Sequence, residues 1–168
     1  AGVEYIMAEK KSIRTFKYRV YPTESQKKEI DFCLETSRLI YNNLLAEKRD
    51  AWKYEKKNRT KFDLQKQTKG NKILHSNLVR GVVVRVDTSF TNFFRRCKEG
   101  AKEKGFPRFK GVNRFSSLCS VSNAPNPKKI GTKTFFPQIG LLKTVYDRPI
   151  QGVPKTITLK KTPIGKHF

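Results

Sequence analysis

The stretch from Asn92 to Lys110 constrains the fold more than any other part of the sequence. Its first residues, Asn-Phe-Phe-Arg-Arg-Cys, have the composition expected at the end of an amphipathic helix. Gly105 and Pro107 then interrupt any helix, and Phe106 is pushed into extended geometry because a proline follows it. We therefore predict a helix that ends here and an extended segment that begins at Gly105.

Residues 105–110 read Gly-Phe-Pro-Arg-Phe-Lys and combine aromatic anchors with cations. We expect Phe106 and Phe109 to pack at the junction between a helical part and a β part. Arg108 and Lys110 would then face a polyanion, because Lys and Arg bind phosphate groups. The alternative interpretation is an ordinary basic loop that its aromatic side chains hold in place.

The region after Pro22 is predicted to form one long helix. Thr23 and Gln26 have the spacing of a capping box, in which each side chain bonds the other residue's backbone amide. The helix should run to about residue 57, because residues that suit a buried face recur at helical spacing until then. That stripe consists of Ile30, Cys33, Leu34, Ser37, Tyr41, Leu44 and Ala51.

Two further helices are expected before the break. A short helix from about residue 62 to 69 would end at Gly70, since glycine favours the C-cap conformation. A second long helix would run from Ser76 to Gly100, because its helical stripe outweighs the local strand preference of residues 82–84. The stripe consists of Leu78, Val82, Val86, Phe90, Phe93 and Cys97.

Strand patterns flank the helices on both sides. Between residues 13 and 21, Phe16, Tyr18 and Val20 alternate with cations, which predicts a strand. Short β-type runs follow the break, at residues 115–121, 134–136, 141–146 and 156–160. Because one strand precedes the helices and several follow them, we predict an α+β fold with a helical bundle inserted into a small β-barrel.

The charge balance indicates a polyanionic partner. The sequence has 37 Lys and Arg against 14 Asp and Glu, a formal net charge of +23. Residues 104–168 hold 13 of these cations and a single acid, Asp147. Ordinary surfaces mix both signs, so nucleic acid is the partner that we expect.

Membrane and metal-binding classes are not supported. No apolar run approaches the roughly 20 residues needed to cross a bilayer, and no signal peptide is visible. We therefore expect a cytoplasmic location and no membrane partner. The three cysteines form no Cys-x-x-Cys pair and the two histidines stand apart from any acidic or thiol cluster, so we expect no metal or cofactor in this chain.

Several motifs together resemble the TnpB family of transposon-encoded, RNA-guided DNA endonucleases, which are related to type V CRISPR effectors. They occur in the family's order and span nearly the whole chain. The motifs are Thr15 to Thr23 with Gln26, Arg38-Leu39-Ile40-Tyr41-Asn42, Asn92-Phe93-Phe94-Arg95, Gly105 to Lys110, Phe136 to Gly140, and Lys155 to Leu159.

This resemblance implies a wedge domain, an oligonucleotide-binding-type β-barrel, interrupted by a helical recognition domain. The expected division is a flexible or non-native N-terminus at 1–11, a first barrel strand at 12–22, the recognition domain at 23–104 and the rest of the barrel at 105–168. The family's RuvC nuclease domain, with its carboxylates and divalent metal ions, is expected to be absent. The chain itself would then not be an enzyme. It would be either a fragment of a full-length parent that cuts DNA or a natural truncated relative that kept binding and lost cleavage.

The resemblance also implies partners, a guide RNA and double-stranded DNA with a short transposon-adjacent motif, and the residues that contact them. DNA-motif contacts are expected from Phe62, Lys66, His75, Ser76, Asn77 and Arg80, with Ser122 and Asn123 beside the same duplex. Their types suit groove readout. The alternative is that they are ordinary solvated residues or helix caps, and Ser76 could be a helix N-cap.

Phosphate contacts to the guide RNA are expected from six cations: Arg14, Lys17, Arg19, Arg108, Lys110 and Arg114. Lys128, Lys129 and Lys133 would do the same or form a disordered basic loop. Trp52 and Phe135 are expected to pack rather than to stack on bases. A second function stays open, that of an autonomous DNA-binding regulator or transposition accessory protein, and the need for a guide RNA would separate the two.

Overall fold

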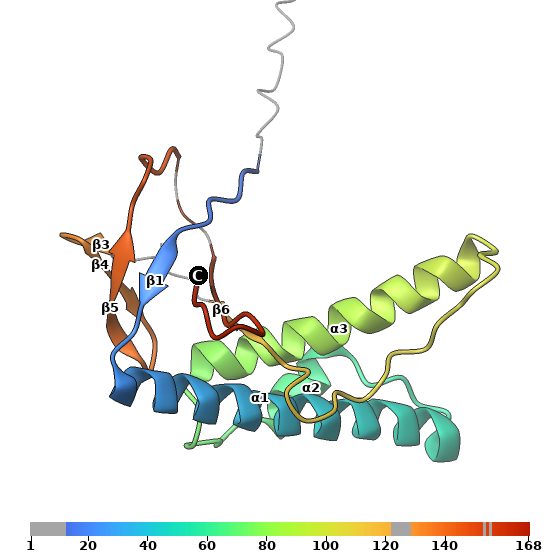
Figure 1. Cartoon of the computed structure of the whole chain (residues 1–168). Helices are drawn as coiled ribbons and strands as arrows, with labels where there is room; N and C mark the ends of the chain where they lie inside the picture. The colour runs from blue at the N-terminus through green and yellow to red at the C-terminus, as the bar shows by residue number, and fades with distance from the viewer. Residues whose placement is uncertain (1–12, 122–128, 153, 155) are drawn as a thin grey trace, which may run out of the picture.

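Helices and strands occupy different sides of the molecule (Figure 1). The computed structural model describes residues 13–121, 129–152, 154 and 156–168. The helical elements are α1 (Glu24–Asp50), the π-helical turn η1 (Ala51–Glu55), α2 (Lys61–Gln67) and α3 (Ser76–Lys98). The strands are β1 (Arg19–Tyr21), β2 (Ser117–Ser120), β3 (Lys129–Ile130), β4 (Lys133–Phe136), β5 (Gly140–Val145) and β6 (Ile157–Lys160). The predicted α+β class is confirmed.

The predicted start of α1 is confirmed. The Thr23 hydroxyl accepts a hydrogen bond from the Gln26 backbone amide at 3.3 Å, and the Gln26 side chain accepts one from the Thr23 amide at 3.0 Å. Every residue of the predicted stripe from Ile30 to Ala51 is buried, so this face of α1 builds the core. The helix continues as η1 to Glu55, close to the predicted end.

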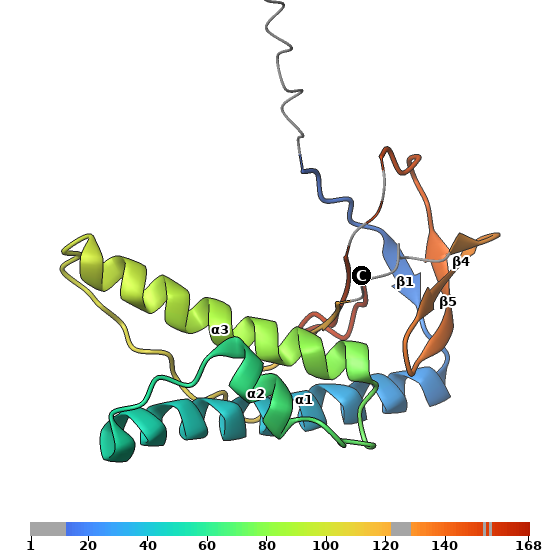
Figure 2. The same ribbon diagram turned by 180° about the vertical axis from the view of Figure 1, so that it is seen from behind.

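The two later helices are also found, with two caps that differ. The short helix ends at Gln67 with Thr68 as its C-cap, so the predicted C-cap Gly70 is wrong. α2 lies across the α1–α3 pair on the side seen in Figure 2, and its buried residue Leu64 joins the core. α3 begins at Ser76, but the residue that caps it is His75, whose Nδ1 accepts a hydrogen bond from the Asn77 amide at 3.2 Å. The valine run is helical, as predicted, because Val83 points into the core.

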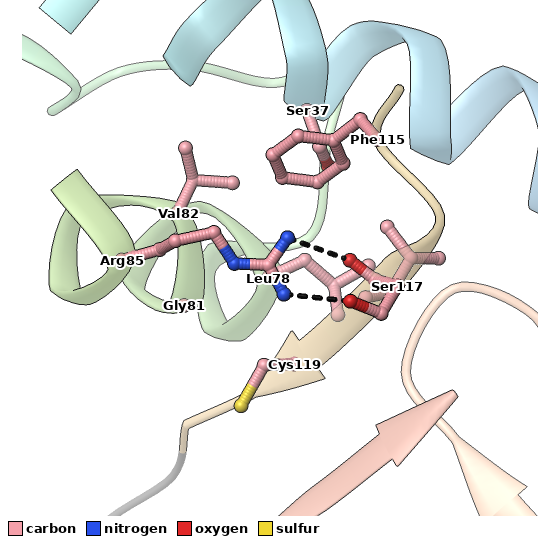
Figure 3. Close-up of a pocket in the computed structure, with 9 residues that line it drawn as sticks. Ser37, Leu78, Gly81, Val82, Arg85, Phe115, Ser117 and Cys119 are labelled. Carbon is pink, nitrogen blue, oxygen red and sulfur yellow. Dashed lines mark hydrogen bonds between the residues drawn. The ribbon is translucent and has the colours of Figure 1, made fainter. Parts of the chain in front are cut away.

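The helices and β2 approach each other closely at Gly81 (Figure 3). A Cβ atom on Gly81 would lie 2.0 Å from the backbone oxygen of Cys119, so only glycine fits. Arg85, one turn later, lies against the ring of Phe115 with its guanidinium carbon 4.5 Å from the centroid. It also donates hydrogen bonds to the Ser117 carbonyl and hydroxyl at 3.2 and 2.8 Å, which ties α3 to β2.

The strands form two antiparallel sheets, one in the order β1-β5-β4-β3 and one of β2 and β6. β1 pairs with β5, with Val20 opposite Thr144, so the strand before the helices does share a sheet with strands after them. That strand is shorter than predicted, since pairing covers Arg19–Tyr21 rather than residues 13–21. β3 was not predicted, because its two residues are too few to show a pattern.

The predicted closed barrel is not found among the described strands. The two sheets are joined instead by the last residues of the chain, since the Val20 amide donates to the His167 carbonyl at 3.1 Å. Phe168 and Lys160 exchange backbone hydrogen bonds at 2.8 and 2.9 Å, which forms a hairpin after β6. Closure needs strands long enough to tilt and stagger around an axis, and these strands have two to six residues.

Candidate nucleic-acid interface

Two motifs that lie far apart in the sequence meet at Lys110. Asn42 of α1 accepts a hydrogen bond from the Lys110 backbone amide and donates another to its carbonyl. Arg38, one turn earlier, donates to the same carbonyl at 3.0 Å. Arg38 also pairs with Glu35, and its hydrogen bonds lower the pKa of that carboxyl group. Arg38 is therefore a structural cation that holds the segment 105–110 on α1.

The expected burial of Phe106 and Phe109 at a junction with the β part is wrong. Their side chains are 45% and 47% exposed. Phe106 packs edge-on against Phe90 and Phe93 of α3, with ring centroids 5.5 and 5.1 Å away. Phe109 lies 5.1 Å from the guanidinium carbon of Arg49 on α1. The segment is extended as predicted, but its aromatic residues anchor it to helices, and in the described chain it pairs with no strand.

The six cations predicted to contact RNA lie in two separate places. The segment beside α1 and the residues just after it carry Arg108, Lys110 and Arg114. The residues before and within β1 carry Arg14, Lys17 and Arg19. Arg108 and Arg114 are exposed. Arg14 is also exposed and its Nη1 donates a 3.4 Å hydrogen bond to the Gln151 side chain.

Beside β1, cations alternate with aromatic rings. The Lys17 ammonium lies 3.9 Å from the centroid of the Phe168 ring. The Arg19 guanidinium carbon lies 5.1 Å from that ring and 5.3 Å from the ring of Tyr21. We call these four residues the cation–aromatic stack. Aromatic rings orient a cation without neutralising it, and neither Lys17 nor Arg19 forms an ion pair with a described acid.

The remaining basic and aromatic candidates are exposed. Lys129 and Lys133 belong to β3 and β4, so they are not part of a disordered loop, while Lys128 falls outside the described residues. Phe135 is 40% exposed and Trp52 is 60% exposed. The expectation that these two aromatic residues pack inside the fold is therefore wrong.

The candidates for DNA-motif contacts occupy outward helix faces. Phe62 and Lys66 are four residues apart on α2, on the side opposite its buried residue Leu64, and both are exposed. Asn77 and Arg80 are three residues apart on α3, away from its buried stripe, and both are half-buried. Polar and aromatic side chains on accessible helix faces are what groove readout requires.

The end of β2 lies beside the start of α3. The Val121 backbone amide donates a hydrogen bond to the Asn77 carbonyl at 3.2 Å. Ser76, in the first turn of α3, is exposed. Ser122 and Asn123 directly follow Val121 but lie outside the described residues.

Gln138 is a residue of this region that sequence reasoning missed. Its Oε1 accepts a hydrogen bond from the His75 backbone amide at 2.7 Å, and its Nε2 donates to Glu29 at 2.9 Å and to the Ile73 carbonyl at 3.2 Å. The backbone of Gln138 has φ +72, which places it in a tight turn between β4 and β5. The Phe-Pro-Gln-Ile-Gly motif signals that turn, but not that its glutamine fixes the start of α3.

Acidic side chains are mostly neutralised within the helical part. Glu47 pairs with Arg59 at 3.1 Å and Glu99 with Arg95 at 2.9 Å. In the ranges that the structure describes, no group of three or more His, Cys, Asp or Glu residues could hold a metal ion. Within the same ranges, no helix is long and apolar enough to cross a membrane.

Comparisons with known proteins connect this arrangement to one family. A helix-turn-helix domain model of the IS605 OrfB proteins (HTH_OrfB_IS605) matches residues 12–57. A curated protein of Streptomyces pristinaespiralis, named "Putative RNA-guided DNA endonuclease", is 26% identical over 167 residues. The match covers 92% of this chain and 40% of that relative, so the chain spans well under half of the relative's length.

The matched range does not fold as a helix-turn-helix. From residue 13 to 57 the structure has the strand β1 and one continuous helix, α1, that ends in η1. Both elements contribute to the surfaces described above, because β1 carries Arg19 and α1 carries Arg38 and Asn42. Residues 13–57 therefore lack the second helix that a helix-turn-helix protein inserts into the DNA major groove.

Proposed function

We propose that the chain is part of the nucleic-acid-binding region of a TnpB-family protein and that it binds a guide RNA and a short transposon-adjacent DNA motif. The cation–aromatic stack carries the proposal. Lys17 and Arg19 are held on rings beside a sheet, with no described acid paired to them. Such preoriented cations suit the phosphates of a polyanion that stays bound, as a guide RNA would.

The helical part would read the DNA motif. Asn77 and Arg80 would contact base edges, since Asn pairs with adenine and Arg with guanine in the major groove. Phe62 would contact thymine methyl groups, and Lys66 a phosphate. Gln138 supports this role, because it holds the start of α3 and would keep these side chains in register.

The proposed division of labour follows the two sides of the fold except at residues 105–110, which belong to the wedge in sequence but lie on α1 and α3. Residues 12–22 and 105–168 would act as the wedge and residues 23–104 as the recognition domain. Cleavage by the parent protein would be the work of a RuvC domain with divalent metal ions, for which this chain supplies no described ligand cluster.

A binding experiment tests the proposal. The chain is titrated with RNA copied from the transposon end that flanks its gene, and separately with a library of duplex DNA. We expect tight RNA binding, and a DNA-motif preference that depends on RNA when the full-length parent is used. Tight, sequence-specific DNA binding by the chain without RNA would instead support a guide-independent regulator.

A further inference from the structure

The solvent-facing side of the larger sheet extends beyond Tyr21, the one residue that it shares with the cation–aromatic stack. Tyr21 of β1 lies opposite Lys143 of β5, which lies opposite Lys133 of β4. One pair along, Phe135 lies opposite Leu141. Side chains two residues apart share a face, so these five residues form one surface, which we call the outer sheet face.

The outer sheet face is unusual because apolar residues are exposed on it. Tyr21 is 51% exposed, while Phe135 and Leu141 are each 40% exposed. The opposite face buries Val20, Phe136 and Leu142, so the sheet already has its core side. Aromatic side chains that face solvent on a sheet contribute little to folding and are typical of a binding surface.

Two lysines face each other in the middle of this surface. Lys133 and Lys143 are direct cross-strand partners, and both are exposed. Like charges in this position weaken strand pairing. No described acid pairs with either lysine. A phosphate group between the two ammonium groups would remove the repulsion, which suits a polyanion as the occupant.

Exposed aromatic rings beside a pair of lysines suit an unpaired strand better than a duplex. A duplex presents only phosphates and groove edges to a flat surface, whereas an unpaired strand offers base faces that stack on aromatic rings. We propose that the outer sheet face binds an unpaired segment of RNA, with a phosphate between Lys133 and Lys143 and bases on Tyr21 and Phe135. The inference rests on the proposed RNA binding and adds which form of RNA this face takes.

The test compares single-stranded RNA, duplex RNA and single-stranded DNA of one mixed sequence as ligands of the chain. Tyr21→Leu and Phe135→Leu should each weaken binding of the single-stranded RNA by about 5-fold to 150-fold. Tyr21→Phe, which keeps the aromatic ring, should bind this RNA as tightly as the unmodified chain does. Duplex RNA binding should change little. Single-stranded DNA should bind more weakly than the RNA. The double variant Lys133→Ala and Lys143→Ala should reduce the salt slope for single-stranded RNA by about 0.7, because the two lysines share one phosphate.

Matched controls come from the helices. Phe32 of α1 is 48% exposed, so Phe32→Leu removes a ring of similar exposure away from the sheet. Lys28→Ala with Lys98→Ala removes two exposed helical cations. Both controls should leave the affinity and salt slope for single-stranded RNA unchanged. Circular dichroism checks that every variant keeps its fold.

The possible failures differ from one another. Unchanged RNA affinity in the Tyr21 and Phe135 variants, while Arg108→Ala with Lys110→Ala weakens it, overturns this inference and leaves the proposed function standing. An absence of RNA binding by the unmodified chain overturns both. Tighter binding of single-stranded DNA than of RNA overturns the choice of RNA. A dimer that Phe135→Lys dissociates without any change in RNA affinity would assign the face to a second copy of the chain.

Discussion

Asn42 and Lys110 are joined by two hydrogen bonds, although 67 residues separate them in the sequence. The Asn42 side chain accepts from the Lys110 amide at 2.8 Å and donates to its carbonyl at 2.9 Å, with a sequence separation of 68 positions. The contact sets the position of the segment 105–110 on α1. It therefore controls where Arg108 and the Lys110 ammonium can meet a phosphate.

Asn42→Ala should lower the free energy of unfolding by about 1–3 kcal/mol, because it leaves a partly buried amide and carbonyl without these partners. Asn43→Ala is the control, since Asn43 is the next residue of α1 and is exposed. Urea denaturation of both variants measures the difference. Equal stabilities would mean that water replaces the Asn42 side chain at no cost.

Phe106→Ala should destabilise the fold by about 1.5 kcal/mol, less than the 3–5 kcal/mol typical of a fully buried ring. The smaller value follows from its exposure of 45% together with its two edge-on ring contacts. Phe32→Ala, at a similar exposure, should cost less, because no ring contact of Phe32 is found in the described chain. Thermal melting of both variants measures the difference in stability. Identical shifts in the melting temperature would show that the ring contacts of Phe106 contribute nothing to stability.

Much of the helical part could be predicted because its signals are local. The Thr23 capping box and the buried stripe from Ile30 to Ala51 depend only on residues in neighbouring turns of one helix. The same holds for the helical assignment of residues 82–84, where the long apolar stripe correctly outweighs the preference of valine for strands. The position of the segment 105–110 could not be predicted, because it depends on a side-chain contact between Asn42 and a distant backbone.

The β part and the site are less visible in the sequence. Closure of a barrel depends on strand lengths and register, so the pattern of short β runs indicated sheets but not their open arrangement. Phe135 and Trp52 look like core residues because aromatic residues are most often buried, and only the pairing of β4 with β5 shows that Phe135 faces solvent. Gln138 acts through tertiary hydrogen bonds that no spacing reveals.

Gly81→Ala should destabilise the fold by roughly 1–3 kcal/mol or more, because the added methyl group would collide with the Cys119 carbonyl. At an ordinary helix position the same change would stabilise. Thr88→Ala, at an exposed position of α3, is the control and should have little effect. Chemical denaturation that finds Gly81→Ala as stable as the parent would contradict the close packing of α3 on β2.

The stability of the fold should depend on the protonation of His167. This side chain is buried, and burial, followed by the nearby Lys161, lowers its pKa from the ordinary value of 6.5. The unfolded chain then binds more protons than the folded chain between the folded pKa and 6.5. Stability is fully present above that window and is lost as the pH falls through it.

Urea denaturation at several values between about pH 8 and pH 5 measures this effect. The parent should lose more stability on acidification than His167→Gln, which cannot titrate at that position. Parallel pH profiles of the two proteins would show that His167 titrates in the same way in the folded and unfolded chains.

The most direct test of the account is the salt dependence of RNA binding. For the unmodified chain, for Arg108→Ala with Lys110→Ala, and for Asn77→Ala with Arg80→Ala, the RNA affinity is measured across a series of salt concentrations. The Arg108 and Lys110 double variant should weaken binding and reduce the log–log slope by about 1.4, whereas the Asn77 and Arg80 double variant should match the unmodified chain. If the Asn77 and Arg80 changes instead reduce the affinity and slope as much, the division between an RNA-binding surface and a DNA-reading surface is wrong.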